Sequence, residues 1–473
     1  MSESWVNSAE RIGSDLLLDL AGPGSRRAVL IRALRRAVRE GRLAPGTRLP
    51  PYRSLAANLG LARNTVADAY AELVAEGWLT ARQGSGTRVA RRAAPVASSR
   101  VPRKVPHRPA GPVHDLRQGR PDTGSFPRTA WSAAARRALN AAPNDAFGPG
   151  DPQGRTELRR ALADYLGRSR GVRTTPERIV ICSGFAHALR LLSGCGILRG
   201  RLAVESYGLG FHRSLLDAAS VRTLPLTLDG DGARVGELAG LSGVRAVLLT
   251  PAHQFPTGGP LGPERRSAVV DWARGRDGLV LEDDYDGEFR YDRDPVGAVQ
   301  GLDPDRVMYA GSVSKSLSPA VRLGWLVLPE RLVAPVLAAK GEREAWASVP
   351  DQLTLAELIT SGQYDRHVRR MRRNYRDRRD RLVAALAERA PHIVPTGIAA
   401  GLHAVLRLPP GTEQSVLKAA AWQGLALDGL DDFRHPDATD RAPDGLVVGY
   451  AAPADHAFAA AVEALCRALP PAP

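Results

Sequence analysis

Apolar residues recur at helical spacing in three short stretches near the start of the chain: Ser25 to Glu40, Tyr52 to Leu59, and Arg63 to Glu76. Each stretch is followed by a glycine that predicts its end: Gly41, Gly60 and Gly77. Residues 78–89 then carry short strand-like runs around a glycine-rich turn, which predicts a hairpin. Helix, helix, tight turn, helix and hairpin is the order of a winged helix-turn-helix domain.

From about residue 128 onward, helical and strand-like stretches alternate. The expected helices are Arg155 to Ser169 and Ala186 to Ser193. The expected strands are Arg178–Ile181, Arg201–Val204, Val244–Leu249, Gly278–Leu281 and Val307–Ala310. Alternation of this kind predicts an α/β fold with a mostly parallel sheet covered on both faces. Ligands of such sheets bind at the carboxyl ends of the strands. Residues suited to chemistry follow these strands: Ser183, Gly184, Thr250 to Gly258, Asp283, Tyr285 and Lys315.

Between the two patterned regions lies a stretch without hydrophobic periodicity. Residues 91–113 contain five prolines and many basic residues, which predicts an extended tether. A plain spacer is the favoured interpretation, although its charge could contact DNA weakly. The expected organisation is a DNA-binding domain at 14–90, a linker at 91–113 and a large domain at 114–473.

The two domains differ in net charge. The formal net charge of the chain is +15. Residues 1–113 hold 19 Lys and Arg against 8 Asp and Glu, and the remaining residues hold 46 against 42. A basic small domain on a near-neutral large one indicates nucleic acid contacted by the small part. The alternative is a general bias toward arginine, which would not by itself segregate the charge.

The cellular setting follows from what the sequence lacks. Three cysteines give neither an even disulfide framework nor a metal-binding spacing, and no apolar run is long enough to span a membrane. The N-terminus is polar and acidic, unlike a secretory signal. We therefore expect a cytoplasmic protein without a metal site.

The third helix of the small domain begins with Arg63, Asn64 and Thr65. Arginine and asparagine make bidentate contacts to guanine and adenine, and a recognition helix presents its N-terminal residues to base edges. Positive charge at a helix start opposes the helix dipole, so Arg63 is not explained as a helix stabiliser. The competing interpretation is a generic three-helix core with solvated arginines.

A single lysine stands at the centre of Val307 to Pro329. Lys315 follows an apolar strand and lies among small and hydroxylated residues, and Arg322 comes seven positions later. A desolvated lysine becomes a nucleophile toward carbonyls, while hydroxyls and an arginine can hold a phosphate. This combination describes a pyridoxal 5′-phosphate (PLP) site. In isolation, a surface lysine in a serine-rich loop would be the simpler explanation.

Three consecutive carboxylates, Glu282, Asp283 and Asp284, precede Tyr285 at the end of another strand. Mutual repulsion at a buried strand end calls for a cation, and a protonated pyridine nitrogen would serve. The tyrosine hydroxyl could hydrogen-bond the ring oxygen. A metal site and a solvated acidic loop are the alternatives.

The small domain resembles the winged-helix domain of GntR-type transcription regulators, through LAPGTRLPPYRSLAANLGLARNTVADAYAELVAEGWLTARQGSGTRV. The resemblance implies DNA contacts by six residues: Arg53, Arg63, Asn64, Thr65, Gln83 and Gly84. Tyr52 departs from the small or acidic residue common before that first arginine.

The large domain resembles fold-type I aminotransferases, and the whole chain resembles the MocR/GabR-type regulators that fuse both parts. The matching segments include FGPGDPQGRTELRRALADYLGRSRGV, TPAHQFPTG, LEDDYDGEFRYD, GSVSKSLSPAVRLGWLVLP and RHVRRMRRNYRDRRDRL. The resemblance implies that Lys315 forms the internal aldimine with PLP, that Asp283 meets the pyridine nitrogen and that Tyr285 meets the ring hydroxyl. It also implies phosphate contacts from Ser312, Arg322 and the backbone of Gly184.

The large domain departs from the family pattern at three places. Phe185 and Ala186 replace polar residues of the phosphate loop. Leu209 stands where a stacking aromatic is usual, with Tyr207 or Phe211 as possible substitutes. The strand Gly445 to Tyr450 has no arginine to hold a substrate carboxylate, although Arg407 or another arginine could replace it.

The sequence therefore predicts a homodimeric transcription regulator that binds paired DNA half-sites and senses PLP, or an amino compound through PLP. A working PLP-dependent aminotransferase is the main alternative, and sustained turnover is not expected. The third possibility is a regulator that has lost its PLP site and responds to another ligand.

Overall fold

The computed structural model describes residues 18–82, 85–91, 112–148, 150–291, 296–341 and 347–472. The chain divides into two compact units, residues 1–109 and residues 110–473. Within the described residues, every helix is too short or too polar to cross a membrane.

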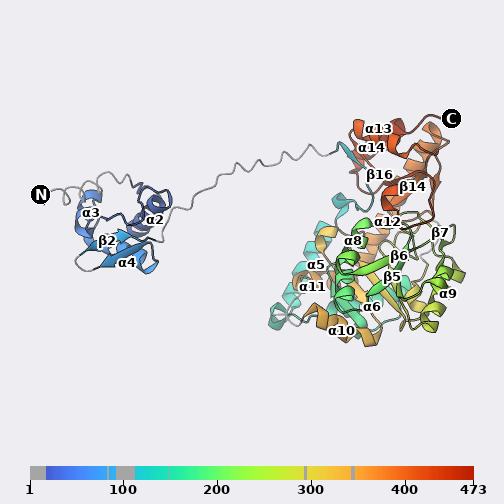
Figure 1. Cartoon of the computed structure of the whole chain (residues 1–473), viewed down its shortest axis with the longest axis horizontal. Coiled ribbons are helices and arrows are strands. Elements are labelled where there is room, and N and C mark those ends of the chain that lie inside the picture. Colours follow the sequence, from blue (N-terminus) through green and yellow to red (C-terminus); the bar gives the residue numbers. More distant parts are fainter. Residues whose placement is uncertain are drawn as a thin grey trace. The chain divides into compact units, whose positions relative to one another are not determined.

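Within its described residues, the first unit contains three helices and a hairpin (Figure 1). The helices are α2 (Arg26–Arg39), α3 (Tyr52–Leu59) and α4 (Arg63–Ala75), and strands β1 (Leu79–Arg82) and β2 (Gly86–Val89) pair antiparallel. Apolar faces of the three helices meet in one core that includes Leu30, Leu34, Leu55, Val66 and Leu73. The predicted winged helix-turn-helix order is confirmed.

A seven-stranded sheet forms the centre of the second unit. Its spatial order is β4 (Ile179–Cys182), β12 (Gly324–Val327), β11 (Val307–Ser312), β10 (Leu279–Asp283), β9 (Val244–Leu249), β5 (Gly200–Glu205) and β6 (Val221–Leu226). All neighbours are parallel except β12, which runs antiparallel to β4 and β11. The loop that carries Lys315 joins β11 to β12 without a crossover helix, as antiparallel neighbours allow. The predicted mostly parallel sheet is confirmed.

Helices cover both faces of this sheet. On one face, α7 (Phe185–Gly194), α8 (Gly210–Ala218) and α10 (Glu330–Lys340) bury Val180 and Cys182 of β4. On the other face, α5 (Arg128–Ala141), α6 (Thr156–Arg170) and α11 (Val349–Thr360) bury Ile179 and Ile181, and α9 (Pro263–Gly275) covers β9 and β10. Alternate residues of one strand thus enter opposite cores, which explains the uninterrupted apolar runs in the sequence.

The C-terminal part of the second unit forms a smaller antiparallel sheet (red and orange in Figure 1). The long helix α12 (Gln363–Arg389) leads into β13 (Pro395–Thr396), β14 (His403–Arg407), β16 (Asp428–Gly429) and β17 (Gly445–Gly449), with helices α13 (Glu413–Trp422) and α14 (Asp455–Ala468). The first strand after the linker region, β3 (His114–Asp115), pairs with β15 (Leu425–Ala426). The remaining short strands, β7 (Leu228–Asp229) and β8 (Gly232–Ala233), form a hairpin.

Candidate cofactor site and DNA-binding helix

A cavity of about 220 Å³ lies where the parallel strands of the large sheet end. Residues at or just beyond the ends of β4, β5, β9, β10 and β11 line it: Ser183, Gly184, Glu205, Thr250, Asp283, Tyr285, Ser312 and Lys315. Arg322 lines it from the segment before β12. All six residues predicted to bind the cofactor therefore border one space, although they lie up to 138 positions apart (184 to 322).

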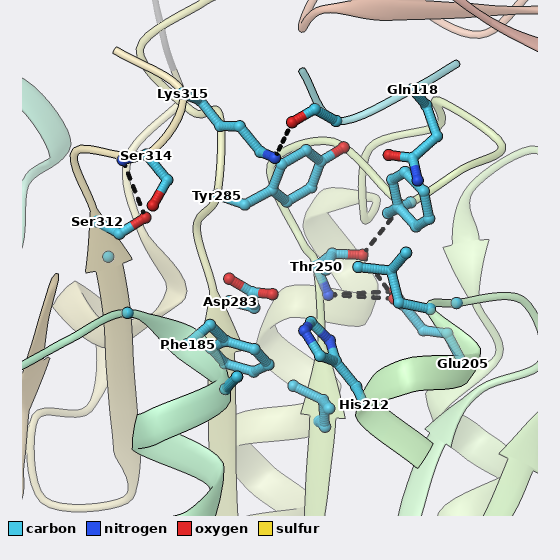
Figure 2. Close-up of a pocket in the computed structure, with 18 of the residues that line it drawn as sticks. Gln118, Phe185, Glu205, His212, Thr250, Asp283, Tyr285, Ser312, Ser314 and Lys315 are labelled. Carbon is cyan, nitrogen blue, oxygen red and sulfur yellow. Dashed lines mark hydrogen bonds between the residues drawn. The ribbon is translucent and has the colours of Figure 1, made fainter. Parts of the chain in front are cut away.

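Lys315 extends from the loop after β11 into this cavity (Figure 2). Its Nζ donates a 2.5 Å hydrogen bond to the carbonyl oxygen of Gly119. Burial lowers the pKa of the Lys315 amine, and the carboxylates of Asp286 and Asp283 oppose that shift. A lowered pKa makes the uncharged, nucleophilic form of the amine more abundant at neutral pH.

The three consecutive carboxylates have separate roles in the structure. Glu282 accepts hydrogen bonds from the backbone amides of Val299 and Gln300, both at 3.0 Å. Asp284 accepts from Arg170 and from the hydroxyl of Tyr309. Asp283 instead faces the cavity, and burial, followed by repulsion from Asp284, raises the pKa of its carboxyl well above the usual range. Protein groups thus satisfy two of the carboxylates, and only Asp283 is left to meet a ligand.

Tyr285 already has hydrogen-bond partners of its own. Its hydroxyl lies 3.0 Å from Nδ1 of His253, and the same nitrogen lies 2.9 Å from Oδ2 of Asp286. The ring of Tyr285 lines the cavity, while His253 and Asp286 lie outside it. This network fixes the orientation of the tyrosine, and a ligand oxygen would have to share the hydroxyl with His253.

Gly184, Ser312 and Arg322, the three residues predicted to contact the phosphate, all line the cavity. Gly184 has φ +112° and precedes the first turn of α7, so the positive end of that helix faces the cavity. Arg322 is exposed, and within the described residues it makes no hydrogen bond or ion pair. The backbone N–H groups of a helix start, a hydroxyl and a guanidinium without a partner among the described residues are groups that can hold a phosphate.

Phe185 and His212 form the aromatic wall of the cavity, with ring centroids 4.9 Å apart (Figure 2). Of the aromatic substitutes predicted for Leu209, Tyr207 lines the cavity and Phe211 does not, because its side chain is 59% exposed. Sequence reasoning missed His212. It lies three residues after Leu209, and this helical spacing on α8 is the signal that could have found it.

Glu205 and Gln118 are two further polar residues of the cavity that the sequence did not reveal. Glu205 accepts hydrogen bonds from Thr250 and Gln254, and burial raises the pKa of its carboxyl to about 7. Gln118 reaches the cavity from the segment after β3. Neither follows a recognisable motif, because each depends on packing between distant segments.

The strand β17, Gly445–Gly449, is fully buried and carries no arginine. Arg407 at the end of β14 is exposed and does not line the cavity, so it does not replace the missing arginine. Arg213 does line the cavity, but its guanidinium donates to the carbonyl oxygens of Gly208, Phe433 and Arg434. The lining thus offers no uncommitted arginine other than Arg322 within the described parts of the chain.

The first unit presents a second candidate site at the start of α4. Arg63 and Asn64 are exposed and Thr65 is half-buried, and within the described residues none of their side chains has a hydrogen-bond partner. The helix also begins without a side-chain cap. Arg53 is exposed on α3, with its guanidinium 5.8 Å from the ring centroid of Tyr52. The predicted DNA contacts Gln83 and Gly84 lie outside the described residues.

Comparison with known families agrees with both units. Residues 27–89 match the family described as bacterial regulatory proteins, gntR family, and residues 112–428 match aminotransferase class I and II. The crystal structure of Pyrococcus horikoshii kynurenine aminotransferase superposes with a TM-score of 0.68 at 24% identity, covering 76% of this chain and 91% of that chain. At this identity, the likeness concerns the fold.

Two relatives are similar over almost their whole length. The pyridoxine biosynthesis transcriptional regulator PdxR of Corynebacterium glutamicum is 33% identical over 426 residues, which cover 89% of this chain and 91% of PdxR. The probable rhizopine catabolism regulatory protein MocR of Rhizobium meliloti is 33% identical over 446 residues, which cover 89% of each. The chain therefore belongs to the helix-turn-helix transcriptional regulators in which a gntR-family DNA-binding domain is joined to an aminotransferase class I and II domain.

Proposed function

We propose that this regulator binds PLP at Lys315, and that occupancy of this site controls DNA binding by the gntR-family unit. One observation carries the proposal. The amine of Lys315 shares a single cavity with the carboxylate of Asp283 and the guanidinium of Arg322, and among the described residues neither of these two groups has a hydrogen-bond or ion-pair partner.

The residues of the cavity fit the groups of PLP. When bound, PLP supplies an aldehyde that condenses with amines and a ring that withdraws electrons. Lys315 offers the amine, and Asp283 can hold a proton on the ring nitrogen, an interaction that would offset the cost of burying its charge. Ser312, Arg322 and the backbone at Gly184 offer donors for the phosphate.

The aromatic wall and the tyrosine network position the ring. Phe185 and His212 supply two aromatic rings, tilted by 57° to each other, and either ring can contact an aromatic ligand. His253 and Asp286 hold Tyr285 so that its hydroxyl is oriented before a ligand enters. Burial lowers the pKa of His212 to about 4, so its imidazole is uncharged at neutral pH and can lie against an apolar ring.

The signal would be PLP itself or an amino compound that reacts through it. The name of PdxR refers to pyridoxine biosynthesis, which favours PLP as the signal, whereas the name of MocR refers to the catabolism of rhizopine. A ligand changes DNA binding only if it binds two states of the protein with different affinity. We further propose that the protein is a cytoplasmic homodimer that recognises paired half-sites on DNA. In each chain, the DNA-binding domain would comprise residues 14–90, the linker residues 91–113 and the PLP-binding domain residues 114–473.

Absorption spectroscopy of the purified protein with added PLP tests this proposal. We expect a visible band, an adduct at Lys315 that borohydride traps, and a change in affinity for an operator duplex selected from a random pool. Lys315→Ala should fold and bind DNA, but it should lack the band and the PLP response. A wild-type protein that shows neither band nor trapped adduct would contradict the proposal.

A further inference from the structure

A hydrogen bond joins Lys315 to a segment that lies 196 positions earlier in the chain. The acceptor, the carbonyl oxygen of Gly119, is 2.5 Å from Nζ. Gly119 has φ +77°, a conformation that favours glycine, and a Cβ built on it would lie 3.4 Å from Nζ. The close approach of Lys315 therefore depends on the backbone geometry of this one residue.

Backbone hydrogen bonds fix this segment on both sides of Gly119. The amides of Leu116, Gln118 and Asp122 are bonded to Ala426 O, Asp428 Oδ2 and Tyr375 Oη, at 3.0, 3.1 and 3.1 Å. Between these fixed points, the backbone of residues 119–121 makes one hydrogen bond within the described residues, the bond from Lys315. Removal of that bond would leave residues 119–121 without a backbone hydrogen bond in the described structure, while the ion pair of Arg120 with Asp115 and the burial of Pro121 would remain.

The position of this segment in the chain makes the contact important. Gln118 and Gly119 line the cavity, and they follow β3, the first strand after residues 92–111. Residues 92–111 are the covalent connection to the gntR-family unit. A shift at Gly119 reaches that connection only through β3, so the hydrogen bonds of β3 to Gly424 and Ala426 must loosen as well.

Condensation with a carbonyl ligand changes what the lysine can donate. The uncharged amine forms a C=N bond with the carbonyl carbon, and its two hydrogens leave with the carbonyl oxygen as one water. The nitrogen is then directed at the ligand and has lost the hydrogens that it donated to Gly119. The carbonyl of Gly119 would have to find another partner or water.

We propose that the hydrogen bond from Lys315 to Gly119 transmits ligand binding from the cavity to the segment that leads to the DNA-binding unit. This inference rests on the proposed function. In the ligand-free protein, the lysine holds residues 119–121 in place. In the ligand-bound protein, this backbone hydrogen bond is lost.

Two substitutions of Lys315 distinguish loss of the hydrogen bond to Gly119 from simple loss of PLP binding. Neither Lys315→Ala nor Lys315→Arg can react like the lysine, but only arginine keeps N–H donors that can reach Gly119. Without PLP, Lys315→Ala should behave like the PLP-loaded wild type. Its Leu116, Gln118 and Asp122 amides should exchange hydrogen severalfold faster, and its operator affinity should shift in the direction that PLP produces. Lys315→Arg should keep exchange at these amides slow.

A second pair of variants leaves the lysine intact. Gly119→Ala strains the left-handed conformation and should speed exchange at the same amides in the absence of PLP. Gly411→Ala is the matched control, because Gly411 has the same φ of +77° and no atom within 4 Å of a built Cβ. It should leave exchange at residues 116–122 unchanged.

The outcomes separate the two proposals. Slow exchange in Lys315→Ala and Gly119→Ala, or unchanged exchange when the wild type forms its adduct, would overturn the transmission mechanism while the PLP site stands. Absence of any PLP adduct would overturn the proposed function. If no adduct forms but hydrogen exchange at these amides is still fast in Lys315→Ala, then Lys315 holds the segment and its ligand is not PLP.

Discussion

Arg170 and Asp284 form a buried ion pair next to the candidate cofactor site, with N–O distances of 2.6 and 3.0 Å and side chains that are each 2% exposed. The pair neutralises the carboxylate that follows Asp283 in the sequence. It therefore leaves Asp283 as the acidic group of the triplet that faces the cavity.

Removal of one partner of this pair should destabilise the second unit strongly. Arg170→Ala leaves an uncompensated buried charge, and we expect the free energy of unfolding to fall by about 3–5 kcal/mol. Arg168→Ala is the control on the same helix, because its ion pair with Asp365 is on the surface and should contribute about 1 kcal/mol or less. Urea unfolding of both variants measures the difference, and equal losses would contradict the assignment.

The reaction of Lys315 with PLP should reach its full rate at a lower pH than that of a free lysine. Only the uncharged amine attacks a carbonyl, and it predominates above the pKa of the amine. Because burial lowers that pKa, the rate should rise with pH and level off below the pH that an exposed lysine requires. The initial rate of band formation against pH, with Nα-acetyl-lysine for comparison, tests this. Coincident profiles would show that Lys315 is not desolvated.

Arg322 should contribute to affinity for PLP and not to the chemistry of its attachment. Loss of a charge-assisted hydrogen bond costs about 1.5–3 kcal/mol, so Arg322→Ala should weaken PLP binding roughly ten- to hundredfold while the visible band still forms at saturation. Arg222→Ala removes an equal charge from an exposed position of β6 and should have little effect. Titration of the visible band gives both dissociation constants. Similar constants for the two variants would exclude Arg322 from the phosphate site.

Arg63 should contribute to sequence-specific recognition of DNA. If it makes a bidentate base contact, Arg63→Ala should lose about 1–3 kcal/mol of operator binding and should relax specificity at one base position. Arg36→Ala, which removes an exposed arginine of α2, should weaken binding to all sequences equally, if at all. Binding to specific and random duplexes at several salt concentrations distinguishes these effects. Unchanged specificity in Arg63→Ala would refute the recognition role of α4.

Sustained transamination is not expected. Neither β17 nor Arg407 supplies an arginine to the cavity, and a substrate whose carboxylate is not held loses much of the advantage of orientation. Slow single half-reactions with amino donors are the expected limit. Steady production of keto acid over many turnovers, measured with common pairs of amino and keto acids, would instead establish an enzyme.

The sequence by itself determined the order of the elements and most residues at the strand ends. Helical spacing in residues 25–76 and apolar runs such as Val307–Ala310 depend on local periodicity, and these elements formed where the pattern placed them. The fusion of two domains was equally clear, because charge and hydrophobic pattern both change between residues 91 and 113. Lys315 could be singled out because a lysine among small residues after a buried strand is chemically unusual.

Only the tertiary structure decided which of several similar residues faces the cavity. Asp283 and Asp284 are adjacent and chemically identical, and Arg170, more than a hundred positions earlier, selects between them. The aromatic wall contains His212 and not Phe211, because the orientation of α8 turns one side chain inward and its neighbour outward. The bond between Lys315 and Gly119 likewise joins segments that no local pattern relates. Such choices depend on packing between distant parts of the chain, which local periodicity does not encode.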